Sequence, residues 1–366
     1  MFIYYFIFIL IIFGFNYFQG NTIKYKYQGK DDYRFILFAG ICFVAVVGLR
    51  ATSVGSDTLQ YEVRYEETLV RLASGFANTE IGFDALQFII KEVLGIGYHG
   101  FLFFIAFFTI GSLFYIIHRY SKDELLSVFI FVQLSFVMYM VNLRQCTALS
   151  ICFWALIAAE KRRPILFVVV VLLAFTMHNS SILFLITYFI WGKQISRRQA
   201  FLIVIFALCS LLLSPLLTPM ISKIAPAKYE DMEFNEDYAI NIIVLLVELL
   251  WILFSLICIP EVKTEKGVYK FSKNDSFFFI LMSLSFSFKM MSILNSQFGR
   301  MGFYFSIGYF ICASSGLMNH RQFNSKIRPI ARLMIVLLCI AYFVIGAKGD
   351  VMGIDEYKFL WEETGN

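Results

Sequence analysis

Long apolar runs, separated by short polar segments, limit what this chain can fold into more than any other feature of its sequence. A helix needs about 20 apolar residues to cross a bilayer, within a range of about 17–25. The predicted fold class is therefore all-α, with one polytopic integral membrane domain over residues 1–366. On this template the sequence predicts about twelve transmembrane helices, at residues 2–18, 34–50, 100–117, 124–141, 143–159, 165–177, 179–191, 200–220, 239–259, 276–296, 300–317 and 330–347.

The composition excludes several classes of protein. Charged residues make up 16% of the chain and hydrophobic residues 59%, whereas soluble domains carry about 25% charged residues. This excludes a soluble enzyme, a nucleic-acid-binding domain and a secreted disulfide scaffold. The net charge of +5 does not indicate nucleic acid as a partner, because the basic residues form short clusters between apolar runs. The seven cysteines lie in or beside apolar runs without a CxxC pair, so we expect no disulfide, metal or cofactor site.

The basic clusters recur in alternate loops, which predicts how the helices are oriented. Cytoplasmic loops of membrane proteins are enriched in Lys and Arg, so the N-terminus is expected outside. The long outer loops are then about 51–99 and 221–238, and the C-terminal tail, 348–366, is also outside. Within the first loop, residues 82–94 have apolar residues at helical spacing but carry three charges. This segment is predicted to be an amphipathic helix on the outer surface.

Unusual polar residues gather at the predicted outer ends of the helices. Arg50, Arg144 and Arg300 each lie at such an end. An arginine near the membrane is costly and usually lines a cavity or pairs with an anion, and its planar fork suits phosphate or carboxylate. A single arginine of this kind is more often a snorkelling interfacial residue. Three arginines on one side of the membrane favour a shared site that binds an anion.

His178 and Asp57 are further candidates on the same side. His178 occupies a short turn between two apolar runs, where it is either a hydrogen-bonded interfacial histidine or a general base. Asp57 and Tyr61 are four residues apart and share a face if their segment is helical. Asp57 or Ser56 then caps that helix, or Asp57 orients an arginine or binds an acceptor hydroxyl.

Glu248 and Lys289 are charged residues that lie deep within predicted spans. Both are expected at a similar depth on consecutive antiparallel helices, so they should pair. The pair is either structural, which we favour, or part of a proton or ion relay.

Four segments, in order along nearly the whole chain, resemble the EpsG family of bacterial polysaccharide-assembly proteins. They are Arg50 with Val54-Gly55-Ser56-Asp57-Thr58 and Tyr61, followed by Glu80-Ile81-Gly82-Phe83; Asn142-Leu143-Arg144-Gln145-Cys146-Thr147-Ala148-Leu149-Ser150; His178-Asn179-Ser180-Ser181; and Gly299-Arg300-Met301-Gly302-Phe303-Tyr304. The last segment departs from the family pattern, because Gly299 stands where an acidic residue often precedes the arginine.

The resemblance implies a polymerase similar to Wzy, the O-antigen and capsule polymerase. Such a protein joins oligosaccharide repeat units carried on undecaprenyl diphosphate, at the outer face of the bacterial cytoplasmic membrane. It acts as a glycosyltransferase without a nucleotide sugar or a metal. Its partners would be the lipid-linked oligosaccharide, the bilayer, a chain-length regulator and a flippase.

Under this resemblance the candidate residues take specific roles. Arg144 and Arg300 would bind the diphosphate with Arg50 assisting, and His178, Asp57 or Glu80 would serve as the base for the acceptor hydroxyl. The remaining substrate-binding candidates are Tyr61, Glu80, Gln145 and Ser181.

Two alternatives remain open at this point. A transporter or flippase of the same lipid-linked glycans would also have about twelve spans, but transporter sites usually lie near the midplane of the membrane. The other alternative, and the third hypothesis in all, is a membrane acyltransferase with His178 as its base.

Overall fold

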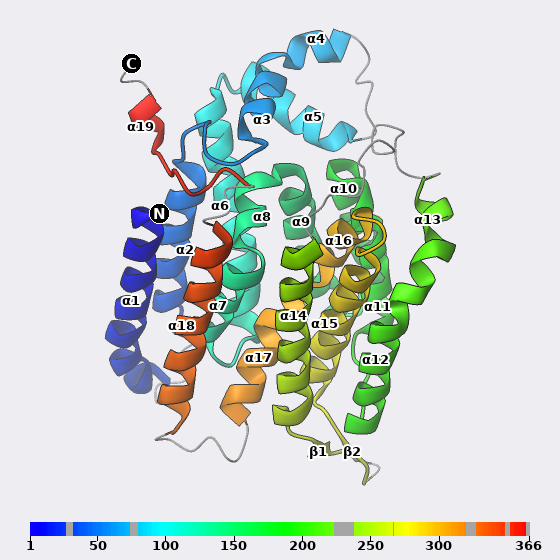
Figure 1. The fold of residues 1–366 in the computed structure, drawn as a ribbon. Coiled ribbons are helices and arrows are strands. Elements are labelled where there is room, and N and C mark those ends of the chain that lie inside the picture. The colour runs from blue at the N-terminus through cyan, green and yellow to red at the C-terminus, as the bar shows by residue number, and fades with distance from the viewer. Residues whose placement is uncertain are drawn as a thin grey trace. The chain divides into compact units, whose positions relative to one another are not determined.

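The structure is a computed structural model that describes residues 1–26, 32–73, 80–222, 238–265, 267–319, 327–347 and 352–363. Helices make up almost all of the described chain (Figure 1), with one two-stranded antiparallel hairpin, β1 (Val262–Lys263) and β2 (Tyr269–Lys270). The predicted all-α class is confirmed. The chain divides into two compact units, each described by itself. The prediction of one membrane domain over the whole chain stays a prediction.

The first unit comprises Met1–Tyr120, Glu124–Ile182 and Ala331–Asn366. In it α2 packs against α6, α6 against α9 and α9 against α10, while α1 contacts α2 and α7. Its elements are α1 (Phe2–Lys26), α2 (Arg34–Gly48), α3 (Thr58–Glu66), α4 (Thr68–Ala73), α5 (Ile81–Phe88), the π-helix η1 (Ile89–Val93), α6 (Tyr98–Tyr120), α7 (Glu124–Leu134), α8 (Phe136–Val141), α9 (Leu143–Glu160), α10 (Pro164–Met177), most of α18 (Ile327–Ala347) and α19 (Leu360–Glu363).

The core of the first unit is aromatic. Phe43 on α2, Phe131 on α7 and Phe136 on α8 are fully buried, and their ring centroids lie 5.1–5.9 Å apart. The rings meet edge to face, the arrangement that aromatic quadrupoles favour. These contacts connect α2 to α7 and α8, which follow about 80 residues later in the sequence.

The second unit comprises Ser121–Asp123 and Leu183–Ile330. Its central element is α15, which packs against α12, α14, α16 and α17 and is buried along most of its length. Its elements are α11 (Ile186–Ile190), α12 (Arg197–Cys209), the 3-10 helix η3 (Ser210–Leu213), α13 (Ser214–Ser222), α14 (Tyr238–Cys258), the hairpin, α15 (Lys273–Met291), α16 (Gln297–Gly302), the 3-10 helix η5 (Phe303–Phe305) and α17 (Ile307–Asn319). The 3-10 helix η2 (Asn179–Leu185) begins in the first unit and ends in the second.

Glu248 and Lys289 pair within the second unit, as predicted. Lys289 Nζ lies 3.6 Å from Glu248 Oε1, and the Tyr309 hydroxyl donates a hydrogen bond of 2.9 Å to Glu248 Oε2. The carboxylate is therefore bound from two helices, α15 and α17. The lysine and the tyrosine thus stabilise the buried negative charge of Glu248, which would be unfavourable without partners.

Every predicted span falls on helical structure, but the count of about twelve membrane crossings is not confirmed. Among the described residues three helices are long and apolar enough to span a membrane: Tyr98–Tyr120, Arg197–Pro219 and Ile327–Ala347. A fourth results if Gln297–Phe305 and Ile307–Met318, which meet at a bend of 46°, form one span. Other apolar helical stretches, among them Phe2–Phe18 and Ile242–Cys258, are 10–17 residues long. At 1.5 Å per residue, a 15-residue helix such as α2 covers about 22 Å of a core about 30 Å thick.

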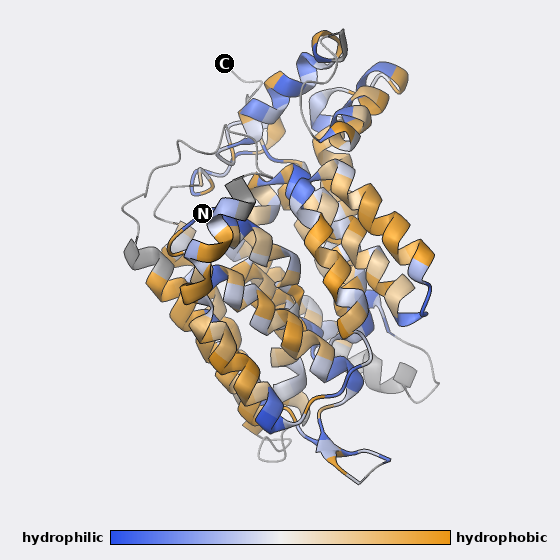
Figure 2. Cartoon of the chain, turned by 90° about the vertical axis from the view of Figure 1, so that its right-hand side faces the viewer, coloured by the Kyte–Doolittle hydropathy of each residue, from blue (hydrophilic) through white to orange (hydrophobic). Residues whose placement is uncertain are grey.

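Many of the helices consist mainly of apolar residues (Figure 2), and many of these side chains are exposed. On α10, Ile165 is 80% exposed and Val169 is 56% exposed. Exposed apolar surface on this scale is unfavourable in water and is expected where a helix faces lipid. The apolar helices therefore identify a membrane protein.

The predicted amphipathic helix is present as α5 and η1. Ile81, Ile89 and Val93 are each about half exposed or more, whereas Asp84 and Gln87 are buried. The segment thus turns Asp84 and Gln87 inward and part of its apolar surface outward, while Glu92 is exposed. It therefore differs from a simple surface helix, in which all the charges face water. Its predicted place on a membrane surface stays a prediction.

The loop before α3 is bound to the C-terminal segment by backbone hydrogen bonds. Gly55 N–H donates to the Gly353 carbonyl at 2.7 Å, Ser56 N–H to Met352 at 2.9 Å, and Ala51 N–H to Lys358 at 2.9 Å. We call residues 49–56 and 352–360 the terminal clasp. Both glycines have positive φ, +94° and +62°, which is why glycine suits these two positions.

Candidate functional site

Glu80 lies at the centre of a cluster built from three elements of the first unit. Its carboxylate accepts hydrogen bonds from Arg144 Nη1, at the start of α9, and from His178 Nδ1, directly after α10. The Glu80 side chain is 9% exposed, Arg144 25% and His178 15%. A buried carboxylate, a guanidinium and an imidazole therefore meet at a partly open position, which suits both anion binding and proton transfer.

Local sequence explains why these three side chains meet. Asn142 leaves the helical region at φ −96° and ψ 72°, so α9 starts directly after α8 and presents Arg144 in its first turn. His178 is extended, at φ −158° and ψ 123°, and its N–H closes the last turn of α10 on Ala174. Since α9 and α10 pack as neighbours, the start of one and the end of the other lie together.

Gly82 allows α5 to approach α10 closely enough for Glu80 to reach His178. A Cβ added at Gly82 would lie 2.1 Å from Thr176 Oγ1, 2.7 Å from its Cβ and 3.0 Å from its backbone carbonyl carbon. Any larger residue must move one of the two helices. The glycine in the 80–83 motif therefore has a packing function that positions the cluster.

Tyr61 completes the cluster from α3. Arg144 Nε donates to the Tyr61 hydroxyl at 3.3 Å, and the guanidinium carbon lies 5.7 Å from the centroid of the Tyr61 ring. Burial raises the pKa of Tyr61, although Arg144 opposes the shift. The hydroxyl therefore stays protonated at neutral pH and serves as a hydrogen-bonding partner.

Asp57 lies directly before α3, near enough for its charge to act on the Tyr61 hydroxyl. The predicted shared face of Asp57 and Tyr61 stays a prediction. Asp57 occupies the N-cap position of α3, yet its side chain makes no capping hydrogen bond and instead accepts one from Ser56 Oγ at 3.3 Å. Asp57 is half buried.

The pKa of Glu80 is lower than its ordinary value of 4.5. Burial alone would raise the pKa, but the hydrogen bond and charge of His178 and the charge of Arg144 outweigh burial. Glu80 is therefore ionised at neutral pH. An ionised carboxylate only accepts hydrogen bonds, so Nδ1 of His178 carries the proton.

The other imidazole nitrogen, Nε2, lies 3.3 Å from Ser180 Oγ. Glu80, His178 and the serine hydroxyl thus form the carboxylate–imidazole–hydroxyl order that places a base beside an alcohol. Ser181 is fully buried, and its hydroxyl has no hydrogen-bond partner within the described structure. Gln145 is also buried, one residue after Arg144.

Arg50 is not part of this cluster. It is fully buried, and its guanidinium donates to backbone carbonyls of Val47, of Val54 at 3.3 Å and of Met140 at 2.5 Å. Burial lowers its pKa. These contacts give Arg50 a structural function, since they bind the end of α2 to the loop before α3 and to α8. Its predicted assistance in anion binding stays a prediction.

Arg300 belongs to α16 in the second unit. Its predicted partnership with Arg144 on one diphosphate therefore also stays a prediction. Within the first unit the structure brings together Arg144, His178, Glu80 and Tyr61 and places Asp57 beside Tyr61.

A second charged cluster lies one helical turn further along α5 than Glu80. The sequence alone predicted no role for it. Asp84, buried on the same helix as Glu80, binds Arg64 of α3 and Arg71 of α4. The available signal was spacing. Glu80 and Asp84 are four residues apart, the spacing of one helical face, whereas Arg64 and Arg71 lie on two different helices, so their spacing gave no such signal.

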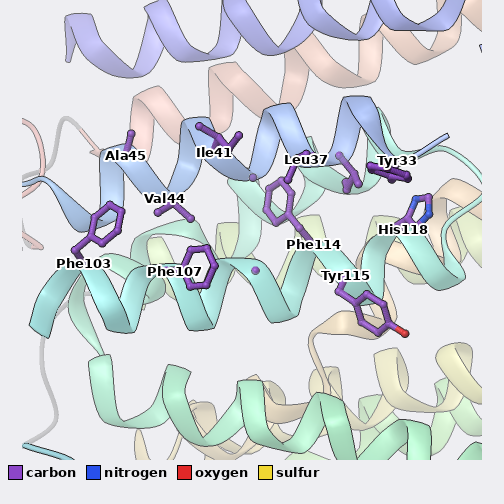
Figure 3. A pocket seen from close by; sticks show the side chains of 13 residues that line it. Tyr33, Leu37, Ile41, Val44, Ala45, Phe103, Phe107, Phe114, Tyr115 and His118 are labelled. Carbon is purple, nitrogen blue, oxygen red and sulfur yellow. The ribbon is translucent and has the colours of Figure 1, made fainter. Parts of the chain in front are cut away.

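An apolar groove runs between α2 and α6 in the same unit (Figure 3). Its volume is about 460 Å³, with Leu37, Ile41 and Val44 on one side and Phe103 and Phe107 on the other. Tyr33 and His118 lie at one end and Ala45 and Phe103 at the other, as Figure 3 shows. A Cβ at Gly111 would meet nothing within 4 Å, so glycine leaves the groove wide there.

Among the residues that the structure describes, no three His, Cys, Asp or Glu side chains gather closely enough to hold a metal ion.

Comparison with known proteins gives one match. No curated protein and no solved structure matches the chain. A family model does, over residues 33–359, which include all four motifs and every residue of the Glu80 cluster. The chain therefore belongs to the EpsG family.

Proposed function

We propose that this protein is a polymerase that joins undecaprenyl-diphosphate-linked oligosaccharide repeat units into a surface polysaccharide. Membership in the EpsG family suggests a membrane protein of polysaccharide biosynthesis with a polymerase-like, glycosyltransferase-like activity. The observation that carries the finer proposal is the sharing of Glu80 between Arg144 and His178. It supports the proposal because a guanidinium, which can bind an anion, and an imidazole, which can act as a base, share one carboxylate.

The proposed reaction is glycosyl transfer. The hydroxyl oxygen of the acceptor sugar bonds to the anomeric carbon of the donor, and the bond from that carbon to the diphosphate breaks. The electron pair leaves with the diphosphate, and the hydroxyl proton passes to the base. Each transfer thus needs stabilisation of a developing phosphate charge and removal of one proton.

Arg144 would stabilise the leaving diphosphate. Its planar guanidinium matches two phosphate oxygens at once. A diphosphate carries more charge than a carboxylate and competes with Glu80 for Arg144. As Arg144 turns to the diphosphate, Glu80 keeps its bond to His178. We propose that Arg300 contributes a second guanidinium to the same diphosphate.

His178 would be the base for the acceptor hydroxyl. Glu80 binds Nδ1 and leaves Nε2 to take the proton, and the negative carboxylate stabilises the imidazolium that forms. The Ser180 hydroxyl already stands beside Nε2 and marks where an acceptor hydroxyl would bind. Asp57, directly before α3, is the alternative base or an orienting group.

The groove between α2 and α6 would hold the polyprenyl tail of the carrier. It is apolar along the length of both helices and opens to the exposed outer faces of Ile41 and Phe107. An isoprenoid chain is apolar and methyl-branched, so side chains such as these lower its free energy by burial.

The proposed location is the cytoplasmic membrane of a bacterium, with the site on the outer face. The basic loops predict this orientation. The repeat unit would arrive from a flippase, and a chain-length regulator would be a further partner.

The test is a glycan ladder from a deletion strain complemented with wild type, Arg144→Ala, His178→Ala or Glu80→Gln. We expect single repeat units at the surface but no long chains in the first two variants. Arg119→Ala is the matched control, because Arg119 pairs with Glu160 at 2.8 Å away from the cluster.

Two outcomes would contradict the proposal. Normal ladders in Arg144→Ala and His178→Ala would remove both residues from the reaction. Loss of every surface band from the deletion strain, with single units retained inside the cell, would indicate the flippase alternative.

A further inference from the structure

Arg64, Arg71 and Asp84 form a compact cluster in which one buried carboxylate holds two guanidinium groups. Arg64 Nη2 lies 2.8 Å from Asp84 Oδ1, and Arg71 Nη2 lies 2.9 Å from Asp84 Oδ2. The Asp84 side chain is 1% exposed, while each arginine side chain is 18% exposed. The carboxylate is therefore inside, and the arginines reach from it toward the solvent.

The two arginines line a cavity of about 390 Å³ between α3 and α4. Its other walls are Leu59, Gln60, Val63 and Glu67, so two cations, an amide and two apolar side chains face one space. Glu67 is exposed and adds a negative charge at this wall. The volume falls within the range of about 300–1,000 Å³ typical of ligand pockets.

Three guanidinium groups are crowded along α5. Burial and then the neighbouring Arg64 lower the pKa of Arg71, although Asp84 opposes them, and Arg144 also contributes to the lowering. Asp84 and Glu80 lie one helical turn apart. Asp84 binds two of these guanidinium groups and Glu80 binds the third. Like charges at short range repel each other, so an anion that binds here relieves the repulsion.

We propose that the Arg64–Arg71 cavity binds the diphosphate of the second lipid-linked substrate, beside the Arg144 position that takes the first. The proposal rests on the function proposed above. Joining two repeat units requires two diphosphate-bearing molecules at once, and the Glu80 cluster offers one guanidinium position. The carboxylates that hold the two guanidinium positions, Glu80 and Asp84, are four residues apart at the start of α5.

The test measures binding by calorimetry on the full-length protein in nanodiscs of phosphatidylcholine. The probe is inorganic pyrophosphate, followed by farnesyl diphosphate, which adds an isoprenoid chain. We expect two binding sites per wild-type molecule. Arg64→Gln with Arg71→Gln should weaken one of them by about tenfold or more, and Arg144→Gln should weaken the other.

Two further variants control for charge and folding. Lys91→Gln removes a nearby cation that pairs with Glu66 outside the cavity, so both sites should remain. The arginine double variant leaves Asp84 buried without its partners. Adding Asp84→Asn removes this buried charge, and the triple variant should show the same loss of one site.

Specific results would overturn the proposal. One is two unchanged sites in the triple variant. Another is loss of the cavity's pyrophosphate binding when phosphatidylglycerol replaces phosphatidylcholine, which would assign the cavity to a phospholipid headgroup. Retained pyrophosphate affinity without any gain for farnesyl diphosphate would assign it to free phosphate. The binding measurement is independent of glycan synthesis. A protein with two binding sites that makes no glycan ladder would therefore support the cavity as a binding site and contradict the proposed polymerase activity.

Discussion

At the scale of single residues, Glu80 joins groups that are distant in sequence. It accepts hydrogen bonds from Arg144, 64 positions later, and from His178, 98 positions later. The sequence identified all three residues, Arg144 and His178 as polar residues beside apolar runs and Glu80 as part of a motif in the long outer loop. It could not pair them, since pairing depends on which helices pack side by side. For Arg50 the sequence predicted an anion partner, whereas the structure gives it backbone carbonyls.

The first residue-scale prediction concerns pH. The pKa of Glu80 is lower in the folded chain than its ordinary value of 4.5. Its contribution to stability is thus fully present above that value and is lost as the pH falls through the lower folded-state pKa. Glu80→Gln should cost about 1.5–3 kcal/mol at neutral pH, and the difference from wild type should shrink below pH 4.5. Unfolding in detergent at a series of pH values measures this.

The control for this pH experiment is Glu66→Gln. Glu66 is 58% exposed and pairs with Lys91 at 2.9 Å, and exposed pairs contribute little to stability. A pH-independent difference between wild type and Glu80→Gln would argue against the ionised Glu80 as the stabilising form.

The second residue-scale prediction concerns the shape of the Arg144 side chain. Arg144→Lys keeps the charge but loses the planar fork that contacts Glu80 and Tyr61. We expect polymerisation to fall by about 10²-fold or more, because an ammonium cannot place two parallel donors on a phosphate. Initial rates of chain elongation in membranes provide the measurement. A lysine variant with wild-type rates would show that charge alone is required.

At the scale of elements, the position of α5 depends on one glycine. The sequence predicted helical spacing over residues 82–94 but not which face is buried. Asp84 and Gln87 turn inward because the arginines of α3 and α4 cover that side. The predicted apolar runs became helices, since hydrophobic periodicity is a local signal. The break at Ser135 between α7 and α8 and the 3-10 turn at residues 179–185 depend on neighbouring helices and were not foreseen.

Gly82→Ala is the prediction for this element. The added methyl group would clash with Thr176, so α5 should move away from α10 and separate Glu80 from His178. We expect strongly reduced polymerisation, by about tenfold or more, in a protein that still inserts into the membrane. Thr176→Gly should restore part of the activity, because the nearest remaining atom would be backbone at 3.0 Å.

Gly97→Ala is the matched control for Gly82→Ala. A Cβ at Gly97 would meet nothing within 4 Å, so this variant should behave as wild type. Equal activities of Gly82→Ala and Gly97→Ala would show that close approach of α5 is not needed.

At the scale of the whole molecule, the first unit is closed by segments from opposite ends of the chain. The terminal clasp binds the loop before α3 to residues 352–360, and the Tyr4 hydroxyl donates to the Ile354 carbonyl at 2.9 Å. The sequence predicted the loop and the C-terminal tail on the same side of the membrane. It gave no sign of their contact, because backbone hydrogen bonds between distant segments leave no residue pattern.

Deleting residues 348–366 tests the clasp. The amides of Ala51, Gly55 and Ser56 lose their acceptors, so we expect their hydrogen exchange to become at least about tenfold faster. Exchange measured by mass spectrometry on the purified protein reports this. Lys358→Ala keeps the accepting carbonyl and should leave exchange unchanged. Slow exchange in the truncated protein would show that the loop holds its shape without the clasp.

The clasp also sets an order in time during synthesis. Gly55 and Gly353 are about 300 residues apart, and ribosomes add roughly 5–20 residues per second. Roughly 15–60 s therefore pass between the translation of the loop and that of the segment that closes it. During the later part of that interval the nascent chain already carries Glu80, Arg144 and His178, while the loop leading to Asp57 and Tyr61 has no partner for its amides. A newly synthesised molecule would thus form its helices early. The part of the site that contains Asp57 and Tyr61 would be complete only after the C-terminal segment folds back.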